Sequence, residues 1–343
     1  MRQMLNVLFI TKPEVYIGLN GENVIVKEED TIIGRYPLHN LEQIVCFSNM
    51  GVSPALMEKC VELNISICFL TPSGRFRARV IGKTRGNVLL RKKQYRVADM
   101  EEESFKIARN FILGKVYNEK WQLERYIRQY SLRVPVKELK SVSDKLREYM
   151  QEIAACENLD QLRGYEGTAQ VLYFSVFDHM ILNQKDTFFF HERSKRPPED
   201  RVNSLLSFAY TLLANDITAA LETVGLDPYV GFMHQDRPGR ASLASDLIEE
   251  LRAPIADRFV LSLINRKQLQ ADDFEINDNK SVYIKDSARR TFISEWQKNK
   301  QEEINHPYLN EKMPWGLVPY SQALLLARYL RGDTDQYPPF FWK

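Results

Sequence analysis

One histidine and three acids lie close together in the stretch HQDRPGRASLASDLIEELR, residues 234–252. From residue 242 onward the apolar residues recur at helical spacing, so Asp246, Glu249 and Glu250 fill one polar arc beside them. Three like charges on one edge of a helix repel each other unless a cation lies beside them. Carboxylate oxygens and an imidazole nitrogen, here that of His234, are suitable ligands for Mn²⁺ and Mg²⁺. A divalent-metal site is therefore one interpretation of this stretch.

The loop before this helix offers a second interpretation. Arg237 and Arg240 flank a Pro-Gly turn, and both can pair with the acids in a purely structural salt-bridge network. In that case His234 is an ordinary packed or hydrogen-bonded residue, which is the commoner fate of an isolated histidine. The stretch by itself leaves both interpretations open.

A further acid, Glu166, stands in RGYEGTAQVLYF (163–174), in the first turns of a predicted long helix. Tyr173 and Phe177 fall on the same helical face, so this glutamate lies on a face that becomes apolar. The glycines on both sides of it would allow another backbone or a phosphate to come close. The alternative is a favourable interaction between the carboxylate and the dipole at the helix N-terminus.

Between Glu62 and Asp99 the sequence has no acidic residue and nine basic ones. Each cation that neutralises a phosphate releases a counterion, so such a stripe suits a nucleic-acid backbone. The alternation in FRARV places the first three arginines on one strand face, where charge can equally protect an edge strand from aggregation. The nine residues are Arg75, Arg77, Arg79, Lys83, Arg85, Arg91, Lys92, Lys93 and Arg96.

The elements that position these side chains divide into a run of strands and a run of helices. Up to about residue 81 short β-branched runs alternate with turns such as Asn20-Gly21, interrupted by one helix that Ser53-Pro54 begins. This order predicts an α+β chain, with a β-strand domain at 1–97 and a larger all-helical domain at 98–343. The predicted helical periods lie near residues 105–130, 160–182, 203–224, 242–252, 255–266, 285–303 and 318–331.

The composition is that of an ordinary soluble globular protein: 343 residues, 44% hydrophobic, 27% charged, with a net charge of +2. No stretch approaches about 18 uninterrupted apolar residues, so we expect a cytoplasmic protein with no membrane segment. The four cysteines have no CxxC spacing, which argues against a thiolate zinc site or a disulfide framework. The proline-aromatic end, DTDQYPPFFWK, is expected to pack as a tail or to bind a partner.

Taken together, the motifs resemble the adaptation endonuclease and integrase of CRISPR systems, the Cas-one family. The resemblance rests on RGYEGTAQVLYF, then RSKRPPEDRVNSLLSFAYTLL (193–213), then GLDPYVGFMHQDRPGRASLASDLIEELRAPIADRFVLSLINR (225–266). The order of these segments matches throughout, and the resemblance covers essentially the whole chain. The double proline and the GLDP wording are most similar to the subtype I-C branch.

The resemblance implies an enzyme that inserts foreign-DNA spacers into a CRISPR array, by attack of a 3′-hydroxyl on a phosphodiester. It implies that Glu166, His234 and Glu249 are the catalytic residues and hold Mg²⁺ or Mn²⁺. Asp246, one helical turn before Glu249, is also an acid in the family pattern, so either acid could contact the ion directly. Glu249 is favoured as the ligand, with Asp246 behind the ligands or on a second ion.

The partners implied by the resemblance are double-stranded and branched DNA and other protein chains. The strand domain is expected to form a homodimer, and two dimers joined by a small partner, Cas-two, form a heterohexameric integration complex. No membrane is involved. The expected DNA contacts are Arg75, Arg77, Arg79, Arg91, Lys92, Arg237 and Arg240.

Two rival functions remain open from the sequence. One is a general metal-dependent nuclease that cuts branched DNA during repair. The other is a non-catalytic DNA-binding scaffold, in which Glu166, His234 and Glu249 form only a buried polar network. Joining of DNA strands distinguishes the first rival from an integrase, and dependence on a metal distinguishes the second.

Overall fold

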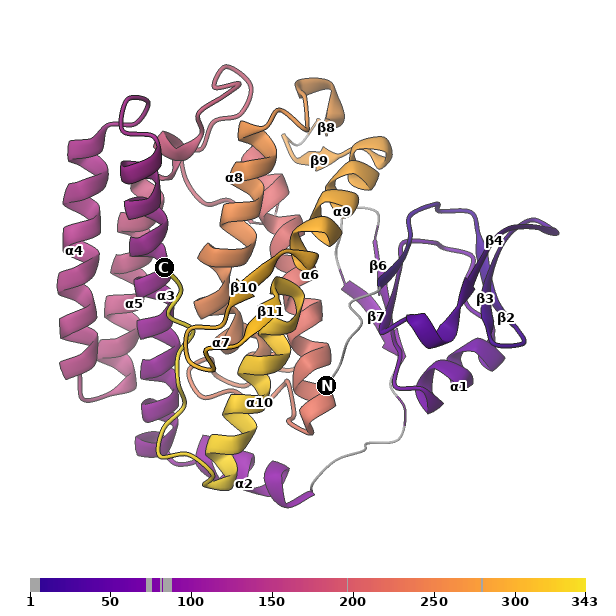
Figure 1. Cartoon of the computed structure of the whole chain (residues 1–343), viewed down its shortest axis with the longest axis horizontal. Helices are drawn as coiled ribbons and strands as arrows, with labels where there is room; N and C mark the ends of the chain where they lie inside the picture. The colour runs from indigo at the N-terminus through magenta and orange to yellow at the C-terminus, as the bar shows by residue number, and fades with distance from the viewer. Residues whose placement is uncertain (1–6, 72–75, 81, 83–87, 196, 279) are drawn as a thin grey trace. The chain divides into compact units, whose positions relative to one another are not determined.

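The structure, a computed structural model, describes residues 7–71, 76–80, 82, 88–195, 197–278 and 280–343. The chain divides into two compact units (Figure 1). The first unit comprises Met1–Arg85 together with Ile284–Gln301, and the second comprises Gly86–Tyr283 together with Glu302–Lys343.

Two sheets are found in the described residues of the first unit. A three-stranded antiparallel sheet has the order β2-β3-β4. A four-stranded sheet has the order β1-β5-β6-β7, in which β1, β5 and β6 run parallel and β7 runs antiparallel at the edge. The strands are β1 (Val7–Ile10), β2 (Tyr16–Asn20), β3 (Asn23–Glu28), β4 (Thr31–Pro37), β5 (Gln43–Cys46), β6 (Ser66–Leu70) and β7 (Phe76–Val80).

Local signals in the sequence account for the turns and the helix of this unit. Gly21 has a φ of 59° at the first position of the two-residue turn between Asn20 and Asn23, so β2 and β3 form the hairpin that Asn20-Gly21 predicts. Helix α1 (Pro54–Glu62) begins after Ser53, whose side chain accepts a hydrogen bond from the backbone N–H of Leu56 at 3.2 Å. Both predictions are confirmed.

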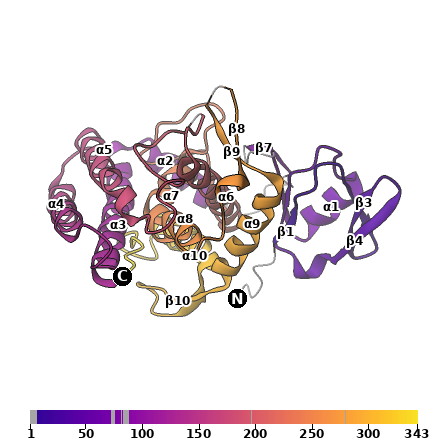
Figure 2. The ribbon, with the colours of Figure 1, turned by 90° about the horizontal axis from the view of Figure 1, so that it is seen from above.

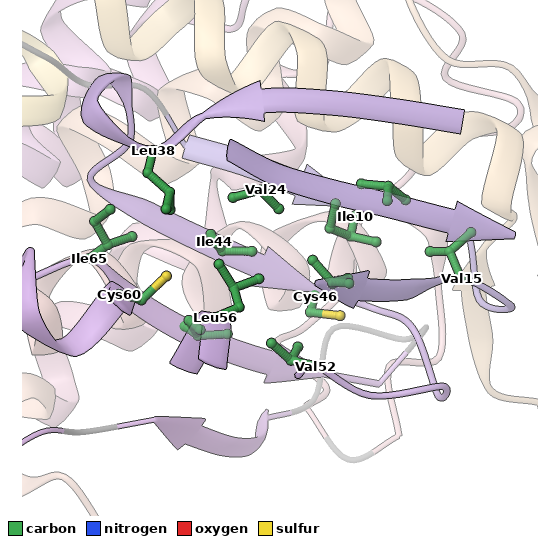
Figure 3. Close-up of a cluster of buried hydrophobic side chains, with 13 residues drawn as sticks. Ile10, Val15, Val24, Leu38, Ile44, Cys46, Val52, Leu56, Cys60 and Ile65 are labelled. Carbon is green, nitrogen blue, oxygen red and sulfur yellow. The ribbon is translucent and has the colours of Figure 1, made fainter. Parts of the chain in front are cut away.

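The core of the first unit joins both sheets to α1. Figure 3 shows Ile10, Val24, Ile44 and Leu56 in one cluster of buried side chains. Each side chain of this size contributes about 1.5–3 kcal/mol when it is fully buried. This shared core explains why two small sheets form one unit.

The second unit is mainly helical. Figures 1 and 2 both show α3, α4 and α5 packed side by side. Helix α6 is long and apolar enough to cross a membrane, but 61% of its most apolar window is buried inside the structure, as in a core helix. The helices are α2 (Val88–Ala98), α3 (Glu101–Gln129), α4 (Val136–Ala155), α5 (Leu159–Ser175), α6 (Arg201–Val224), α7 (Ser242–Leu251), α8 (Arg258–Asn265) and α10 (Val318–Arg331).

The α+β order is confirmed, but the later part of the chain is not all-helical. Two short hairpins occur there: β8 (Phe274–Ile276) with β9 (Val282–Ile284), and β10 (Glu303–Asn305) with β11 (Lys312–Pro314). Strands of three residues are too short to produce a recognisable alternation, so the sequence pattern did not reveal them.

The division between the units also differs from the predicted boundary at residue 97. Helix α2 belongs to the second unit, because the Gln94 side chain donates to the carbonyls of Asp227 and Val230, both at 2.8 Å. Helix α9 (Asp286–Gln301) belongs to the first unit, where the Arg289 guanidinium lies 5.4 Å from the ring of Phe47. Both contacts join residues far apart in the sequence, which local patterns do not reveal.

Candidate active site

Helix α7 carries the three acids of the predicted polar arc, but none of them faces solvent. Asp246, Glu249 and Glu250 have exposed fractions of 0%, 4% and 0%. A buried carboxylate must be hydrogen-bonded or paired with a cation, and each of the three has its own partners. The three acids that the sequence places on one polar arc therefore lie in three different environments in the structure.

Asp246 is enclosed by the loop that carries His234. Its Oδ2 accepts the backbone N–H groups of Phe232 and Met233 at 2.6 and 3.1 Å, and its Oδ1 accepts the N–H of His234 at 3.0 Å. Gly231 permits this wrapping, since a Cβ there would lie 2.7 Å from Oδ2. The carboxylate therefore fixes the path of the loop.

The same carboxylate orients the histidine ring. His234 Nδ1 lies 2.6 Å from Asp246 Oδ1, and an ionised carboxylate can only accept, so Nδ1 carries the proton. Nε2 then keeps its lone pair in the neutral ring, and it makes no hydrogen bond to the described residues. An imidazole held in this way is suited to bind a metal or to accept a proton.

Glu249 lies between two cations. Its Oε2 is 2.9 Å from Lys115 Nζ of α3, and its Oε1 is 3.0 Å from the guanidinium of Arg252. Burial alone would raise the pKa of this carboxyl, but the charges of Arg252 and Lys115 hold it at about 2. Glu249 is therefore ionised at neutral pH, although it is buried.

Glu166 of α5 faces the same lysine. Its Oε1 pairs with Lys115 Nζ, and Gln170, one turn later on α5, accepts from the same ammonium at 2.9 Å. The Glu166 side chain is 21% exposed, whereas that of Lys115 is 2% exposed. A Cβ added to either glycine near Glu166 on α5 would meet nothing within 4 Å, so this part of α5 is open. The structure thus brings Glu166 and Glu249 to one buried ammonium.

A third glutamate, Glu119, lies one turn after Lys115 on α3. It is 4% exposed, and its Oε2 has no hydrogen-bond partner among the described residues. Burial raises the pKa of Glu119 to about 8, although the charge of Lys115 opposes that shift. For Lys115, burial lowers the pKa, but the charges of Glu249, Glu119 and Glu166 raise it to about 12. Lys115 is therefore charged at neutral pH while Glu119 is largely protonated.

Glu250 points away from these charges and holds the end of the chain. It accepts from the Tyr337 hydroxyl, from the backbone N–H of Phe340 at 2.9 Å and from Gln322 Nε2 at 2.9 Å. Burial raises its pKa to about 7, and these hydrogen bonds limit the rise. Figure 1 shows the C-terminal segment running along α3, where Asn118 Nδ2 donates to the Phe340 carbonyl at 2.7 Å. The proline-aromatic end therefore packs as a tail.

Among the described residues, the α7 acids have partners other than the arginines of the 226–241 loop. Glu249 pairs with Lys115 and Arg252, so the alternative in which Arg237 and Arg240 pair with the acids does not hold for this glutamate. Arg237 is exposed and Arg240 is half-buried, and the N–H of Arg240 closes a turn onto the carbonyl of Arg237 at 3.0 Å.

The other predicted DNA contacts are distributed over both units. Arg77 and Arg79 lie on the edge strand β7, and Arg77 donates to the side chain of Asn49. Arg91 and Lys92 lie on α2, half-buried and exposed respectively. Arg75 lies outside the described residues.

Three residues of the site were not predicted from the sequence, namely Lys115, Glu119 and Arg252. The first two lie on the buried side of α3 together with Ile112, Val116 and other apolar residues. A charged residue that keeps the register of an apolar stripe is the signal that could have identified them. Arg252 follows α7 directly and begins a π-helical segment, Arg252–Asp257, that contains Pro254.

Comparison with known proteins gives a consistent assignment. The family model described as CRISPR associated protein Cas1 matches residues 8–298. A relative named CRISPR-associated endonuclease Cas1 1, from Chlorobaculum tepidum, is 46% identical over 343 residues and 100% of both chains.

The solved structures similar to this chain share its fold. A casposase bound to integration product has a TM-score of 0.83 at 20% identity, over 98% of this chain and 93% of that one. A chain of a Cas6-RT-Cas1–Cas2 complex has a TM-score of 0.81 at 24% identity, over 100% of this chain and 37% of that one. These solved structures agree in fold with the assignment. The family model and the full-length relative show that the chain belongs to the CRISPR associated protein Cas1 family.

Proposed function

We propose that the chain is a metal-dependent DNA endonuclease and integrase of CRISPR adaptation. The observation that carries the proposal is the meeting of Glu166 and Glu249 at one buried cation, beside a histidine whose ring Asp246 orients. The enzyme class agrees with the relative that is named an endonuclease. The reaction is attack of a DNA 3′-hydroxyl, or of water, on a phosphodiester.

The residues present fit a divalent ion. Two carboxylates and one imidazole are a donor set for Mn²⁺ or Mg²⁺, and Oε2 of the buried Glu249 has an ion-pair partner, Lys115 Nζ at 2.9 Å, but no hydrogen bond of regular geometry among the described residues. In those residues no three His, Cys, Asp or Glu side chains already converge on one point, and Lys115 lies between the two glutamates. When bound, the ion would neutralise charge on the phosphate and lower the pKa of the nucleophile.

The side chains around the ligands have separate tasks. Arg252 and Lys115 keep Glu249 ionised and ready to bind a cation. Asp246 fixes the His234 ring, and because four N–H groups already occupy its oxygens, a positioning role fits better than a metal ligand. His234 Nε2 either binds the ion or carries a proton, and both tasks use the same lone pair.

DNA binding is assigned to the basic residues around and beyond this site. Arg237 and Arg240 lie a few residues after His234, so they are the candidates for phosphate groups next to the reacting one. Arg77, Arg79 and Arg91 are candidates for longer contacts with the duplex, together with Lys92 and Arg75. Backbone contacts of this kind carry no sequence information.

The partners belong to the same proposal. The chain would act as a homodimer, and two dimers would join through the small protein Cas2, which accompanies Cas1 in the similar Cas6-RT-Cas1–Cas2 complex. The substrates would be double-stranded and branched DNA, in the cytoplasm and without a membrane. The likeness to the subtype I-C branch remains a prediction.

The test is strand transfer on a branched DNA that mimics a half-integrated spacer. With Mn²⁺ the intact protein should join one strand and release another, and a chelator should abolish both products. Glu166→Gln should lose the activity and keep DNA binding. Asp160→Asn, on the same helix but with a side chain 93% exposed, should keep both.

The outcomes separate the rival functions. Cleavage of branched DNA without joined product would favour a repair nuclease. Binding without any metal-dependent product would favour a non-catalytic scaffold. Full activity of Glu166→Gln would remove Glu166 from the site altogether.

A further inference from the structure

Lys115 lies buried between the two glutamates of the proposed metal site. Its ammonium donates hydrogen bonds to Glu166 Oε1 and, at 2.9 Å, to Gln170 Oε1, and it forms an ion pair with Glu249 Oε2 at 2.9 Å. The side chain is 2% exposed, so water contributes little to its solvation. Lys115 therefore occupies the position between the two carboxylates that the metal site requires.

The charges of this arrangement balance without an ion. Lys115 and Arg252 supply two positive charges, and Glu166 and Glu249 supply two negative charges. A divalent ion on the same carboxylates would add two positive charges next to a buried ammonium that has then lost its partners. Leaving a buried charge without its partner is costly, so the ion and the ammonium oppose each other.

We infer that Lys115 is an internal cation that competes with the divalent ion for Glu166 and Glu249, and that a DNA phosphate relieves this competition. The inference rests on the proposed function. A phosphodiester that enters the site brings the negative charge that the displaced ammonium needs. The ion and the DNA then bind cooperatively, and each raises the affinity of the other by the same factor.

Metal binding without DNA tests the first half of the inference. Mn²⁺ is titrated into the DNA-free full-length protein, and free Mn²⁺ is measured by its electron paramagnetic resonance signal. Lys115→Met should bind Mn²⁺ at least about 10-fold more tightly than the intact protein, because no ammonium opposes the ion. Lys115→Arg keeps the charge and should bind Mn²⁺ as weakly as the intact protein. This variant provides the test if Lys115→Met does not fold, because tighter Mn²⁺ binding by Lys115→Arg would contradict the competition.

A matched control comes from the same helix. Lys106 pairs with Glu102 and Glu103, and its side chain is 44% exposed. Lys106→Met should leave Mn²⁺ affinity unchanged, because its charge lies outside the site. If Lys115→Met binds Mn²⁺ no more tightly than the intact protein and the Lys106→Met control, the competition does not exist.

Metal binding with DNA tests the second half. Adding the branched DNA should raise the Mn²⁺ affinity of the intact protein by about 10-fold or more, and that of Lys115→Met by much less. Glu119 is the other acceptor within one turn of Lys115, so Glu119→Gln should retain the coupling. If Glu119→Gln loses the coupling, the ammonium moves to Glu119 and the role of the phosphate is wrong.

The failure of this inference differs from the failure of the proposed function. Glu166→Gln should lose Mn²⁺ binding if the metal site is correct. If that variant binds Mn²⁺ as the intact protein does, the proposed metal site is wrong. If Glu166→Gln loses binding while Lys115→Met gains none, only the inference about Lys115 is wrong.

Discussion

Two adjacent glutamates of α7, Glu249 and Glu250, have opposite environments. Glu249 is flanked by Lys115 and Arg252, which hold its pKa at about 2. In the described part of the chain the partners of Glu250 are neutral, such as the Tyr337 hydroxyl, and burial raises its pKa to about 7. Both are at most 4% exposed, so burial alone does not decide the charge of a carboxylate. The formal charge of the neighbours decides it.

The comparison separates two faces of α7: the face of Glu249, which is suited to chemistry, and the face of Glu250, which stabilises the fold. An ionised carboxylate that cations already surround can exchange one cation for another, so Glu249 suits a metal site. A carboxyl group that accepts hydrogen bonds from neutral groups instead holds a segment in place, and Glu250 holds the C-terminal tail. Substitutions on each face test this separation.

The greatest loss of activity is expected from Glu249→Gln. Strand transfer should fall by at least about 10²–10³-fold, the range observed when one preorganised electrostatic group is removed. The measurement is the rate of joined product at saturating Mn²⁺, with DNA binding as the control. Removing one partner of a buried pair also destabilises the fold, so the double variant Glu249→Gln with Lys115→Met should regain stability but not activity. Recovery of activity in the double variant would contradict the assignment.

Glu250→Ala should affect stability instead. The change leaves the Tyr337 hydroxyl, the Phe340 N–H and the Gln322 amide without an acceptor in a buried place. We expect a loss of about 3–4 kcal/mol in the free energy of unfolding, measured by urea denaturation. Glu250→Gln, which keeps an acceptor, should lose much less. A Glu250→Ala protein as stable as the intact one would show that the tail is not held by this residue.

The sequence predicted the positions of these elements better than their partners. Apolar spacing and caps indicated α6 and α7, and the left-handed Gly225, with a φ of 89°, ends α6 as expected. Helix α4 was not among the predicted helices, and the three-residue strands gave no detectable alternation. Local patterns therefore predicted the long elements whose ends are marked by residues such as Gly225, and they missed the three-residue strands.

The ligand set was available from motifs, but its electrostatics were not. The resemblance implied Glu166, His234 and Glu249, and the structure brings the two glutamates to one ammonium group. That ammonium belongs to Lys115, which lies on a helix more than fifty residues away in the sequence from Glu166. Its role depends on the crossing of α3 with α5 and α7, and no local pattern contains that information.

Glu119 offers an intermediate case between the two glutamates of α7. Its folded pKa is about 8 and its usual pKa is 4.5, so between these values the folded state holds a proton that the unfolded state has lost. Stability from this group therefore falls as the pH rises from 4.5 to 8, by about 2–3 kcal/mol between pH 5 and pH 7. In chelator, Glu119→Gln should lose this slope and be more stable than the intact protein at pH 8. Parallel pH profiles would show that Glu119 is ionised.

The mildest change is expected from Asp246→Asn, which probes how the face for chemistry is positioned. Every N–H group around Asp246 donates, and an asparagine has only one oxygen to accept them. We expect the NH₂ of the new amide to donate a hydrogen bond to His234 Nδ1. Nδ1 must then accept, so the ring proton moves to Nε2. Nε2 then loses its lone pair, so strand transfer should fall by about 10–100-fold. The nitrogen chemical shifts of the ring report the tautomer directly. A purely structural role for Asp246 would lower stability and leave the Nδ1 proton where it is, whereas a positioning role moves that proton and lowers the activity together.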